Sequence, residues 1–450
     1  MFSAGKNRIL HWVVISSVIA ASACRQTVLP PPSDVELVTA WADMATYLTQ
    51  HTPSNSPTFA SRAFGYIGLT MYESVVQGYS GHQSVAPQLN GLGVLEKPEN
   101  DKVYHWPLAL NAGQAEILRS VYVQTSGANK KRVDSLEAAF EQRWKNEGID
   151  REQFVRSIHY GKTIAREIFE WSKSDGGHRA YLKNFDKTLP VRSFPGSWKP
   201  PLYAQSFSHY PLHPHWGKNR CFLEANAATE APVPLTYDTT PGSAYYEQFR
   251  QVYEKSKELT LLEKEAAIWW GDDPDLSFTP PGHSYSMGTI AIRQRKPDLI
   301  TCAETYARLG IAVADAFRNC WKWKFQYFTE RANTFIPEHI DSTWESFWPD
   351  PPFPAFPSGH AMQAAAAATV LTDLYGDKFP FADSSHVGKP EDPIRKVGFK
   401  ARSFDSFWAA AEETANSRFY GGIHIPIDNE KGLEKGKEIG TNINRLKWKR

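Results

Sequence analysis

Apolar residues recur every three or four positions along most of the chain beyond residue 33, the spacing typical of amphipathic helices. The first such segment begins with a Ser-Asp capping signal at Ser33, and the later segments follow the same logic. We see no long alternation of apolar and polar residues that would predict strands, and no internal repeat. The pattern therefore predicts an all-α fold built from helix bundles. The expected helices cover residues 33–49, 60–77, 113–124, 130–147, 151–173, 243–256, 260–270, 285–295, 299–323, 359–375, 404–419 and 428–446.

One long segment, residues 175–232, interrupts this periodicity and is rich in Gly, Pro, His and Trp. Loops of this length are uncommon unless they have a function, so we expect it to shape the mouth of a pocket. It belongs to a predicted N-terminal helical region, residues 33–240. A C-terminal helical region, residues 241–450, follows it.

The N-terminus has the features of a signal peptide over residues 1–24. Lys6 and Arg8 precede a short apolar stretch, and small residues lead to Cys24. Two outcomes stay open: a lipoprotein with a lipid anchor at Cys24, or simple secretion, since Ala21 stands where lipoprotein signals usually have Leu. Either outcome implies export, to the periplasm, to the outer membrane as an anchored lipoprotein, or to the medium. No later segment has the ~18 apolar residues of a transmembrane helix.

Charge and cysteine content narrow the function further. Lys plus Arg number 50 and Asp plus Glu number 49, which gives no reason to expect a nucleic-acid partner. Beyond Cys24, the odd set Cys221, Cys302 and Cys320 predicts neither a disulfide framework nor a zinc motif. Aromatic residues make up 13% of the chain, a content suited to packing helices and lining a pocket.

Three short segments contain candidate catalytic and ligand-binding residues. In the first, Lys324 and Arg331 stand seven positions apart, so that on one helix both cations would share a face. Such a pair usually lies on a solvent-exposed face of a helix. Here, however, aromatic residues surround it in sequence, which favours a buried role; they are Trp321, Trp323, Phe325, Tyr327 and Phe328.

The second segment runs from Phe353 to His360. Ser358 is a suitable N-cap for the alanine-rich helix that follows, and the free amides near Gly359 would then form an anion site at the helix start. His360 adds an acid/base group. An ordinary capped helix with an incidental histidine is the alternative.

The third segment places Arg418 in the last turn of a helix that stops at Gly421 and Gly422, and His424 at the start of the next element. The turn can bring both side chains to one point. A lone arginine and a lone histidine beside a helix end is the alternative. Together the three segments supply three cations, a hydroxyl, a backbone amide and two histidines, a set suited to a tetrahedral oxyanion.

The order and spacing of these segments resemble the superfamily that joins vanadium-dependent haloperoxidases with type 2 phosphatidic-acid phosphatases and bacterial acid phosphatases. The family pattern has Pro after the Arg of the first segment, where this chain has Ala332. The resemblance is specific from Trp321 to His424 and implies the helical-bundle fold of that superfamily. It implies a vanadate-binding set of Lys324, Arg331, Ser358, Gly359, His360, Arg418 and His424.

The resemblance also implies roles. It assigns His424 as the vanadium ligand of a peroxidase, or as the phosphohistidine nucleophile of an acid phosphatase. It assigns His360 as the catalytic acid/base, and Lys324 as the group that polarises peroxide.

Two aromatic residues separate the branches of the superfamily. Trp321 and Phe353 match a pair that haloperoxidases place beside vanadate, where they form a halide pocket; simple core packing is the alternative reading. The length and export of the chain also fit a haloperoxidase, and it is most similar to the bacterial iodoperoxidases. The resemblance therefore implies oxidation of halide, iodide above all, by hydrogen peroxide. An acid phosphatase acting through His424 and a non-enzymatic surface lipoprotein are the alternatives.

Three further features of the sequence are weaker. The stretch from Pro280 to His283 resembles the second segment without its Ser, and we expect a loop near the pocket. Asp272 or Asp273 would orient Arg418 or lie exposed. A histidine-rich stretch, His209, His213 and His215, lacks the ligand spacing of a zinc site.

Overall fold

The structure is a computed structural model that describes residues 29–190, 192–201, 203–205 and 208–450. The predicted signal peptide and Cys24 lie outside the described residues. Within these ranges, none of the helices combines the length and hydrophobicity that crossing a membrane requires.

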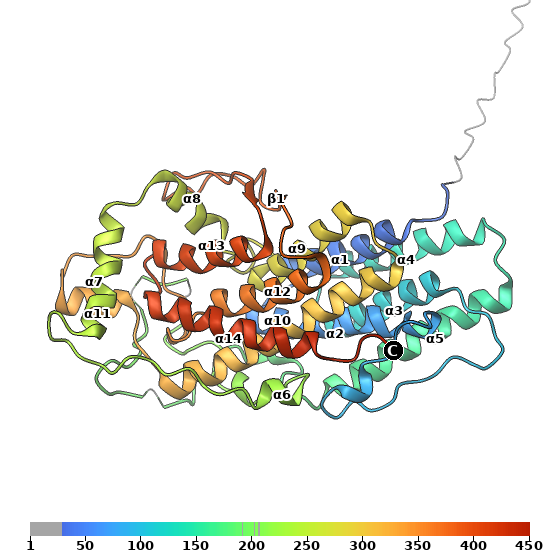
Figure 1. Ribbon diagram of the computed structural model, residues 1–450, viewed down its shortest axis with the longest axis horizontal. Coiled ribbons are helices and arrows are strands. Elements are labelled where there is room, and N and C mark those ends of the chain that lie inside the picture. Colours follow the sequence, from blue (N-terminus) through green and yellow to red (C-terminus); the bar gives the residue numbers. More distant parts are fainter. Residues whose placement is uncertain (1–28, 191, 202, 206–207) are drawn as a thin grey trace, which may run out of the picture.

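The prediction of an all-α fold is confirmed: helices form an elongated body, with the C-terminal helices lying side by side along it (Figure 1). The described residues between 175 and 232 are mostly irregular and include the short helical turns η3 (Ala180–Leu182), η4 (Trp216–Lys218) and α6 (Glu224–Ala227). The longer helices are α1 (Asp34–His51), α2 (Pro57–Glu73), α3 (Trp106–Val121), α4 (Gly127–Lys145), α5 (Arg151–Ser172), α7 (Ala244–Lys257), α8 (Leu261–Trp269), α9 (Thr279–Arg295), α10 (Leu299–Tyr327), α11 (Ala332–His339), α12 (Gly359–Tyr375), α13 (Phe407–Tyr420) and α14 (Pro426–Asn444).

Several predicted boundaries are wrong. Helix α9 begins at Thr279, so Pro280 and His283 lie in its first turns and not in a loop, because proline is well tolerated at a helix start. Phe404 belongs to a strand: β2 (Arg402–Phe404) pairs antiparallel with β1 (Phe381–Asp383) in a small sheet. These strands have three residues each, too few to produce a visible alternation in the sequence.

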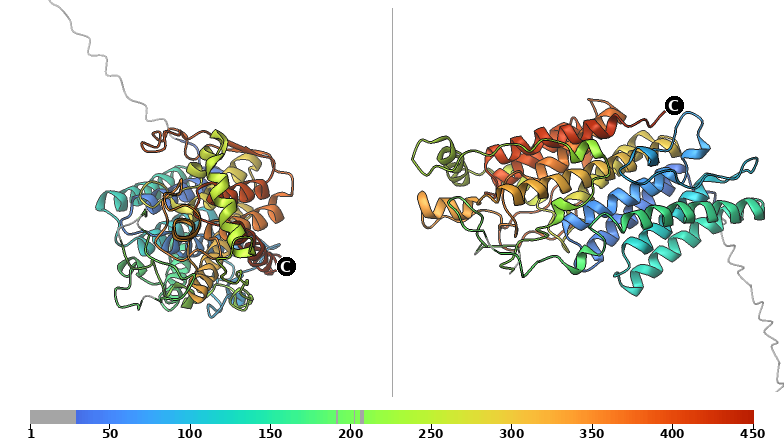
Figure 2. Two further views of the ribbon diagram at one scale, coloured as in Figure 1. Left: turned by 90° about the vertical axis from the view of Figure 1, so that its left-hand side faces the viewer. Right: turned by 90° about the horizontal axis from the view of Figure 1, so that it is seen from below.

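The centre of the body is α10, which packs along α2 on one side and α12 on the other (Figure 2). Two contacts require glycine. A Cβ atom at Gly68 would lie 2.1 Å from the carbonyl oxygen of Tyr306, where α2 meets α10. A Cβ atom at Gly436 would lie 2.1 Å from the carbonyl oxygen of Met362, where α14 meets α12. The second of these close approaches holds the N-terminal halves of α12 and α14 together.

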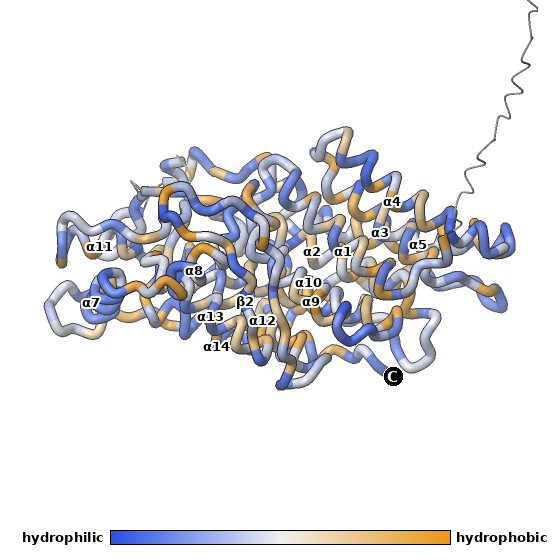
Figure 3. The backbone as a smooth tube through the Cα atoms, turned by 90° about the horizontal axis from the view of Figure 1, so that it is seen from above, coloured by the Kyte–Doolittle hydropathy of each residue, from blue (hydrophilic) through white to orange (hydrophobic). Residues whose placement is uncertain are grey.

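One buried apolar cluster extends from Leu37 to Trp448 and includes residues of both predicted regions. Hydrophobic segments concentrate along the middle helices, and hydrophilic ones lie at the outer loops and helix ends (Figure 3). The two predicted regions, residues 33–240 and 241–450, therefore share this apolar cluster.

Candidate active site

Lys324 lies near the C-terminal end of α10, which continues to Tyr327 and ends where Phe328 adopts a left-handed conformation with φ of 56°. The ammonium group is fully buried and donates hydrogen bonds to the carbonyl oxygens of Pro354, at 2.9 Å, and Ala355. Burial lowers the pKa of Lys324 to about 7. Two of the three ammonium protons are engaged, which leaves one for a bound ligand.

Arg331 does not share a helix with Lys324, contrary to the prediction, because the turn at Phe328 separates α10 from α11. Arg331 is the N-cap residue of α11. Its guanidinium donates to the carbonyl oxygens of Phe353, at 3.0 Å, and Ile423, at 2.7 Å. Arg331 therefore links the second segment, at Phe353, to the third, at Ile423. The turn at Phe328 allows Lys324 and Arg331 to approach the same site from two different helices.

Ser358, Gly359 and His360 form the start of α12, as predicted. The Ser358 hydroxyl accepts the amide of Ala361 at 3.4 Å, and the Ser358 amide donates to the carbonyl oxygen of Asp428 at 3.0 Å. Burial, aided by the charge of Arg418, holds the pKa of His360 well below its usual range, so the ring is neutral. Its buried Nε2 atom has no hydrogen-bond partner within the described ranges.

Arg418 and His424 flank the turn between α13 and α14. Arg418 is completely buried and donates from Nη1 to the carbonyl oxygen of Trp270 at 3.1 Å, whereas no described residue pairs with its Nε and Nη2 groups. The Nδ1 atom of His424 lies 2.8 Å from a carboxylate oxygen of Asp428. Burial and the neighbouring cations hold the pKa of His424 well below its usual range. The neutral ring thus donates from Nδ1 and keeps the Nε2 lone pair available.

Asp428 is a site residue that the sequence reasoning missed. It lies four residues after His424 in the first turn of α14, and it is buried. Its signal in the sequence was the spacing, since a helical turn places a carboxylate at this offset beside the histidine.

Beside these groups lies a cavity of about 370 Å³, whose lining does not include Lys324, Arg331 or Ser358. Gly359, His360, Arg418 and His424 line it, and Trp321 and Phe353 form a wall with ring centroids 4.8 Å apart. Lys324 and Arg331 are buried behind Phe353, each with its charge 5.3 Å from the centre of that ring. The long segment contributes Asn184, Phe185, Gln205 and Leu212 to the lining of the cavity.

A tetrahedral oxyanion fits this donor set. Lys324, Arg331 and Arg418 are buried together, and the Nε and Nη2 groups of Arg418 have no hydrogen-bond partner among the described residues. Burying such groups without partners costs free energy, so the arrangement calls for an anion with several acceptor oxygens. The residues present therefore fit vanadate or phosphate.

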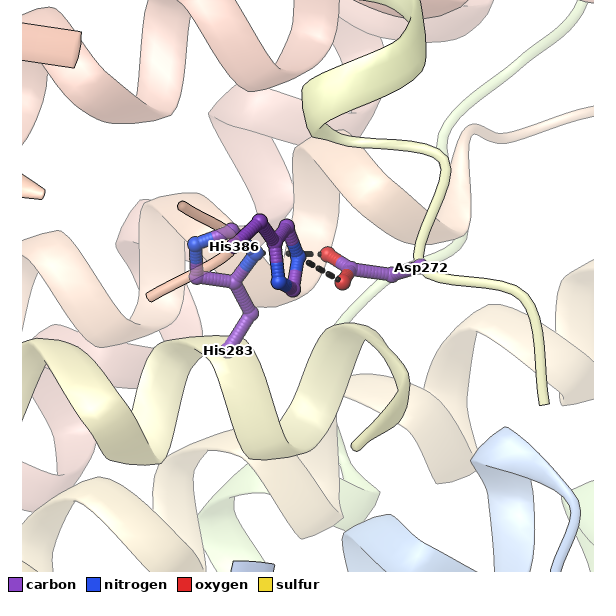
Figure 4. Close-up of side chains that lie close together, drawn as sticks. All are labelled: Asp272, His283 and His386. Carbon is purple, nitrogen blue, oxygen red and sulfur yellow. Dashed lines mark hydrogen bonds and ion pairs between the residues drawn. The ribbon is translucent and has the colours of Figure 1, made fainter. Parts of the chain in front are cut away.

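The weaker sequence features fall near the cavity. Asp272 and Asp273 both line it, and their charges partly offset the effect of burial, which lowers the pKa of Arg418 to about 10. Arg418 itself bonds to the Trp270 carbonyl. Asp272, His283 and His386 are gathered within a few ångströms (Figure 4). In the described part of the chain, that is the one gathering of potential metal-binding side chains, and the histidine-rich stretch of residues 209–215 is not in it.

Known proteins resemble the chain in fold and in sequence. Residues 304–448 match the VCPO second helical-bundle domain. The curated vanadium chloroperoxidase of Curvularia inaequalis is 22% identical over 356 residues, and the match spans 58% of that enzyme. A bacterial vanadium-dependent iodoperoxidase of known structure is 31% identical, with a TM-score of 0.79 over 93% of this chain and 97% of that one. A bacterial vanadium-dependent chloroperoxidase in its apo form, 15% identical, shares the fold with a TM-score of 0.65 over 88% of this chain and 94% of that one.

Likeness over nearly the whole length of these structures puts the protein among the all-helical haloperoxidases. Because the likeness to the iodoperoxidase extends to sequence, the chain belongs to the vanadium-dependent haloperoxidase family, whose cofactor is vanadate.

Proposed function

We propose that this protein is a vanadate-dependent peroxidase that oxidises halide, iodide above all, with hydrogen peroxide. The overall reaction converts iodide, peroxide and a proton to hypoiodous acid and water. The observation that carries the proposal is the Trp321–Phe353 wall directly beside the cationic residues. Aromatic rings there favour a large, weakly hydrated halide over a strongly hydrated phosphate ester. The similarity in sequence to a bacterial iodoperoxidase supports iodide as the halide.

Each residue of the site has a place in this proposal. His424 would bind the cofactor through Nε2, because Asp428 holds its Nδ1 proton. Lys324, Arg331 and Arg418 would neutralise the oxyanion, with the Ser358 hydroxyl and the Gly359 amide as further donors. Bound vanadate supplies Lewis acidity without a change in oxidation state.

The remaining chemistry concerns protons. His360 is neutral and lines the cavity with an unpaired Nε2, so it can accept a proton from peroxide that enters. Lys324, with one proton free, can donate a hydrogen bond that draws electron density from the peroxide oxygens as halide attacks. The C-terminal region, residues 241–450, would then contain all of these groups, and the N-terminal segments would form the opening.

The test loads purified protein with orthovanadate and measures oxidation of iodide, bromide and chloride by peroxide. A parallel assay offers the vanadate-free protein a chromogenic phosphate ester. We expect halide oxidation, fastest with iodide. Hydrolysis of the ester without any halide oxidation would overturn the proposal in favour of the acid phosphatase alternative, in which His424 is the nucleophile.

A further inference from the structure

A buried cluster adjoins the cavity on the side of Arg418. Asp272 accepts hydrogen bonds on both carboxylate oxygens, from Nδ1 of His283 at 2.7 Å and from Nε2 of His386 at 2.8 Å (Figure 4). On its other side, His283 donates from Nε2 to Asp383 at 2.7 Å. Asp272, His283, His386 and Asp383 are almost completely buried. We refer to these four residues as the Asp272 cluster.

Hydrogen bonding accounts for the cluster better than a metal ion does. The candidate ligand atoms of Asp272, His283 and His386 spread over 4.8 Å, whereas atoms on one zinc ion lie about 3.5 Å apart. Both nitrogens of His283 face carboxylates, and these raise its pKa to about 10, which keeps the ring protonated. A metal ion would have to displace that proton.

The cluster is attached to the segment that contacts Arg418. The indole N–H of Trp269 donates to Asp383 at 2.8 Å, and the ring of Trp270 stacks on His283 with centroids 4.4 Å apart. Asp272 itself has a left-handed backbone, with φ of 50°, that the two histidine bonds hold in place. The carbonyl oxygen of Trp270, within this anchored segment, accepts the Nη1 hydrogen bond of Arg418 at 3.1 Å.

The Trp270 carbonyl is the one hydrogen-bond partner of the Arg418 side chain among the described residues. The Nε and Nη2 groups of Arg418 have no hydrogen-bond partner in the described part of the chain, so they are the groups left to bind the oxyanion. A shift of the Trp270 carbonyl would rotate the guanidinium away from the cavity that it lines with His360. Displacements of about 1 Å at such positions are enough to weaken a site strongly.

We propose that the Asp272 cluster is a positioning device for Arg418, with His283 and His386 fixing the segment from Trp269 to Asp272 so that the guanidinium faces the oxyanion. The inference rests on the vanadate site proposed above. It assigns to His283, His386 and Asp383 a function in vanadate affinity, although none of the three lines the cavity.

The test measures binding of orthovanadate to the purified protein by equilibrium dialysis, which needs no halide turnover and so is independent of the proposed reaction. His386→Leu removes the donor to Asp272, whereas His386→Gln carries an amide N–H that can reach the same carboxylate oxygen. We expect His386→Leu to raise the Kd for vanadate roughly tenfold or more, as loss of a supporting partner typically does. We expect His386→Gln to stay near the wild-type value.

Thr289→Val is the matched control. Thr289 lies on α9, the helix of His283, and its hydroxyl bonds to the Tyr306 hydroxyl at 2.7 Å, away from the cluster. This variant should lower Tm without changing the Kd for vanadate. Equal affinities of His386→Leu and wild type, or equal losses in His386→Leu and His386→Gln, would overturn the inference. If His386→Leu does not fold, Asp383→Asn replaces it, and an unchanged Kd in that variant contradicts the proposal equally.

Discussion

The carboxylate of Asp428 lies 2.8 Å from Nδ1 of His424, one helical turn away in α14. This pairing fixes which ring nitrogen carries the proton and which is free to bind a ligand. Replacing His424 by Ala should therefore abolish peroxidase activity and, under the alternative reading, phosphatase activity as well. Activity that survives this change would show that the site lies elsewhere.

Asp428→Asn tests the pairing more finely. The amide retains the size of the carboxylate but loses the charge that fixes the His424 proton. We expect vanadate to bind about 10–100-fold more weakly, the usual range for loss of such a partner. Equilibrium dialysis gives the affinity, and circular dichroism checks the fold. An affinity equal to that of wild type would mean that His424 needs no support from Asp428.

Arg418→Lys tests the guanidinium. Lysine keeps a positive charge but lacks the planar fork that can donate at once to the Trp270 carbonyl and to an oxyanion. Losing one charge-assisted hydrogen bond costs roughly 1.5–3 kcal/mol, or about 10–100-fold in the Kd for vanadate. Lys187→Arg, at an exposed position, is the matched control. This variant should bind vanadate with the affinity of the wild type. Wild-type affinity in Arg418→Lys would show that charge alone suffices.

Phe353→Leu tests the aromatic wall. Leucine keeps the site apolar but removes the ring that packs on Trp321 and lies over two cations. We expect kcat/KM for iodide to fall several-fold and turnover of a phosphate ester by the vanadate-free protein to rise. Steady-state kinetics with both substrates measure the change. A variant in which iodide oxidation is unchanged would assign the ring to core packing alone.

Glu73 offers a prediction about stability, far from the site. It is buried, its carboxylate accepts the amides of Val85, at 2.9 Å, and Ala86, and burial raises its pKa to about 7. Because the folded pKa lies above the ordinary value of 4.5, this group stabilises the fold at low pH. That contribution is lost as pH rises from about 4.5 to about 7, at up to roughly 1.4 kcal/mol per pH unit.

Glu73→Gln keeps an acceptor for both amides but cannot ionise. Chemical denaturation of both proteins between pH 4.5 and 8 should show the variant gaining stability relative to wild type as pH rises. A difference that stays constant with pH would mean that Glu73 ionises normally in the folded protein.

The sequence alone determined the helical class and most of the residues around the cavity. Apolar spacing reports a helix because each turn repeats locally, and Ser358 before an alanine-rich stretch specifies a helix start with free amides. The spacing of the Lys324, Ser358 and Arg418 segments was enough to indicate an oxyanion site. Local signals therefore specified what the site contains.

Tertiary structure decided how those parts meet. Lys324 and Arg331 converge because α10 ends at Phe328, and a sequence spacing of seven could not distinguish that turn from a continuous helix. The close approach of α14 to α12 at Gly436 brings Asp428 and His424 beside Ser358. The Asp272 cluster joins residues more than a hundred positions apart. Such contacts depend on the packing of whole helices, which no local pattern records.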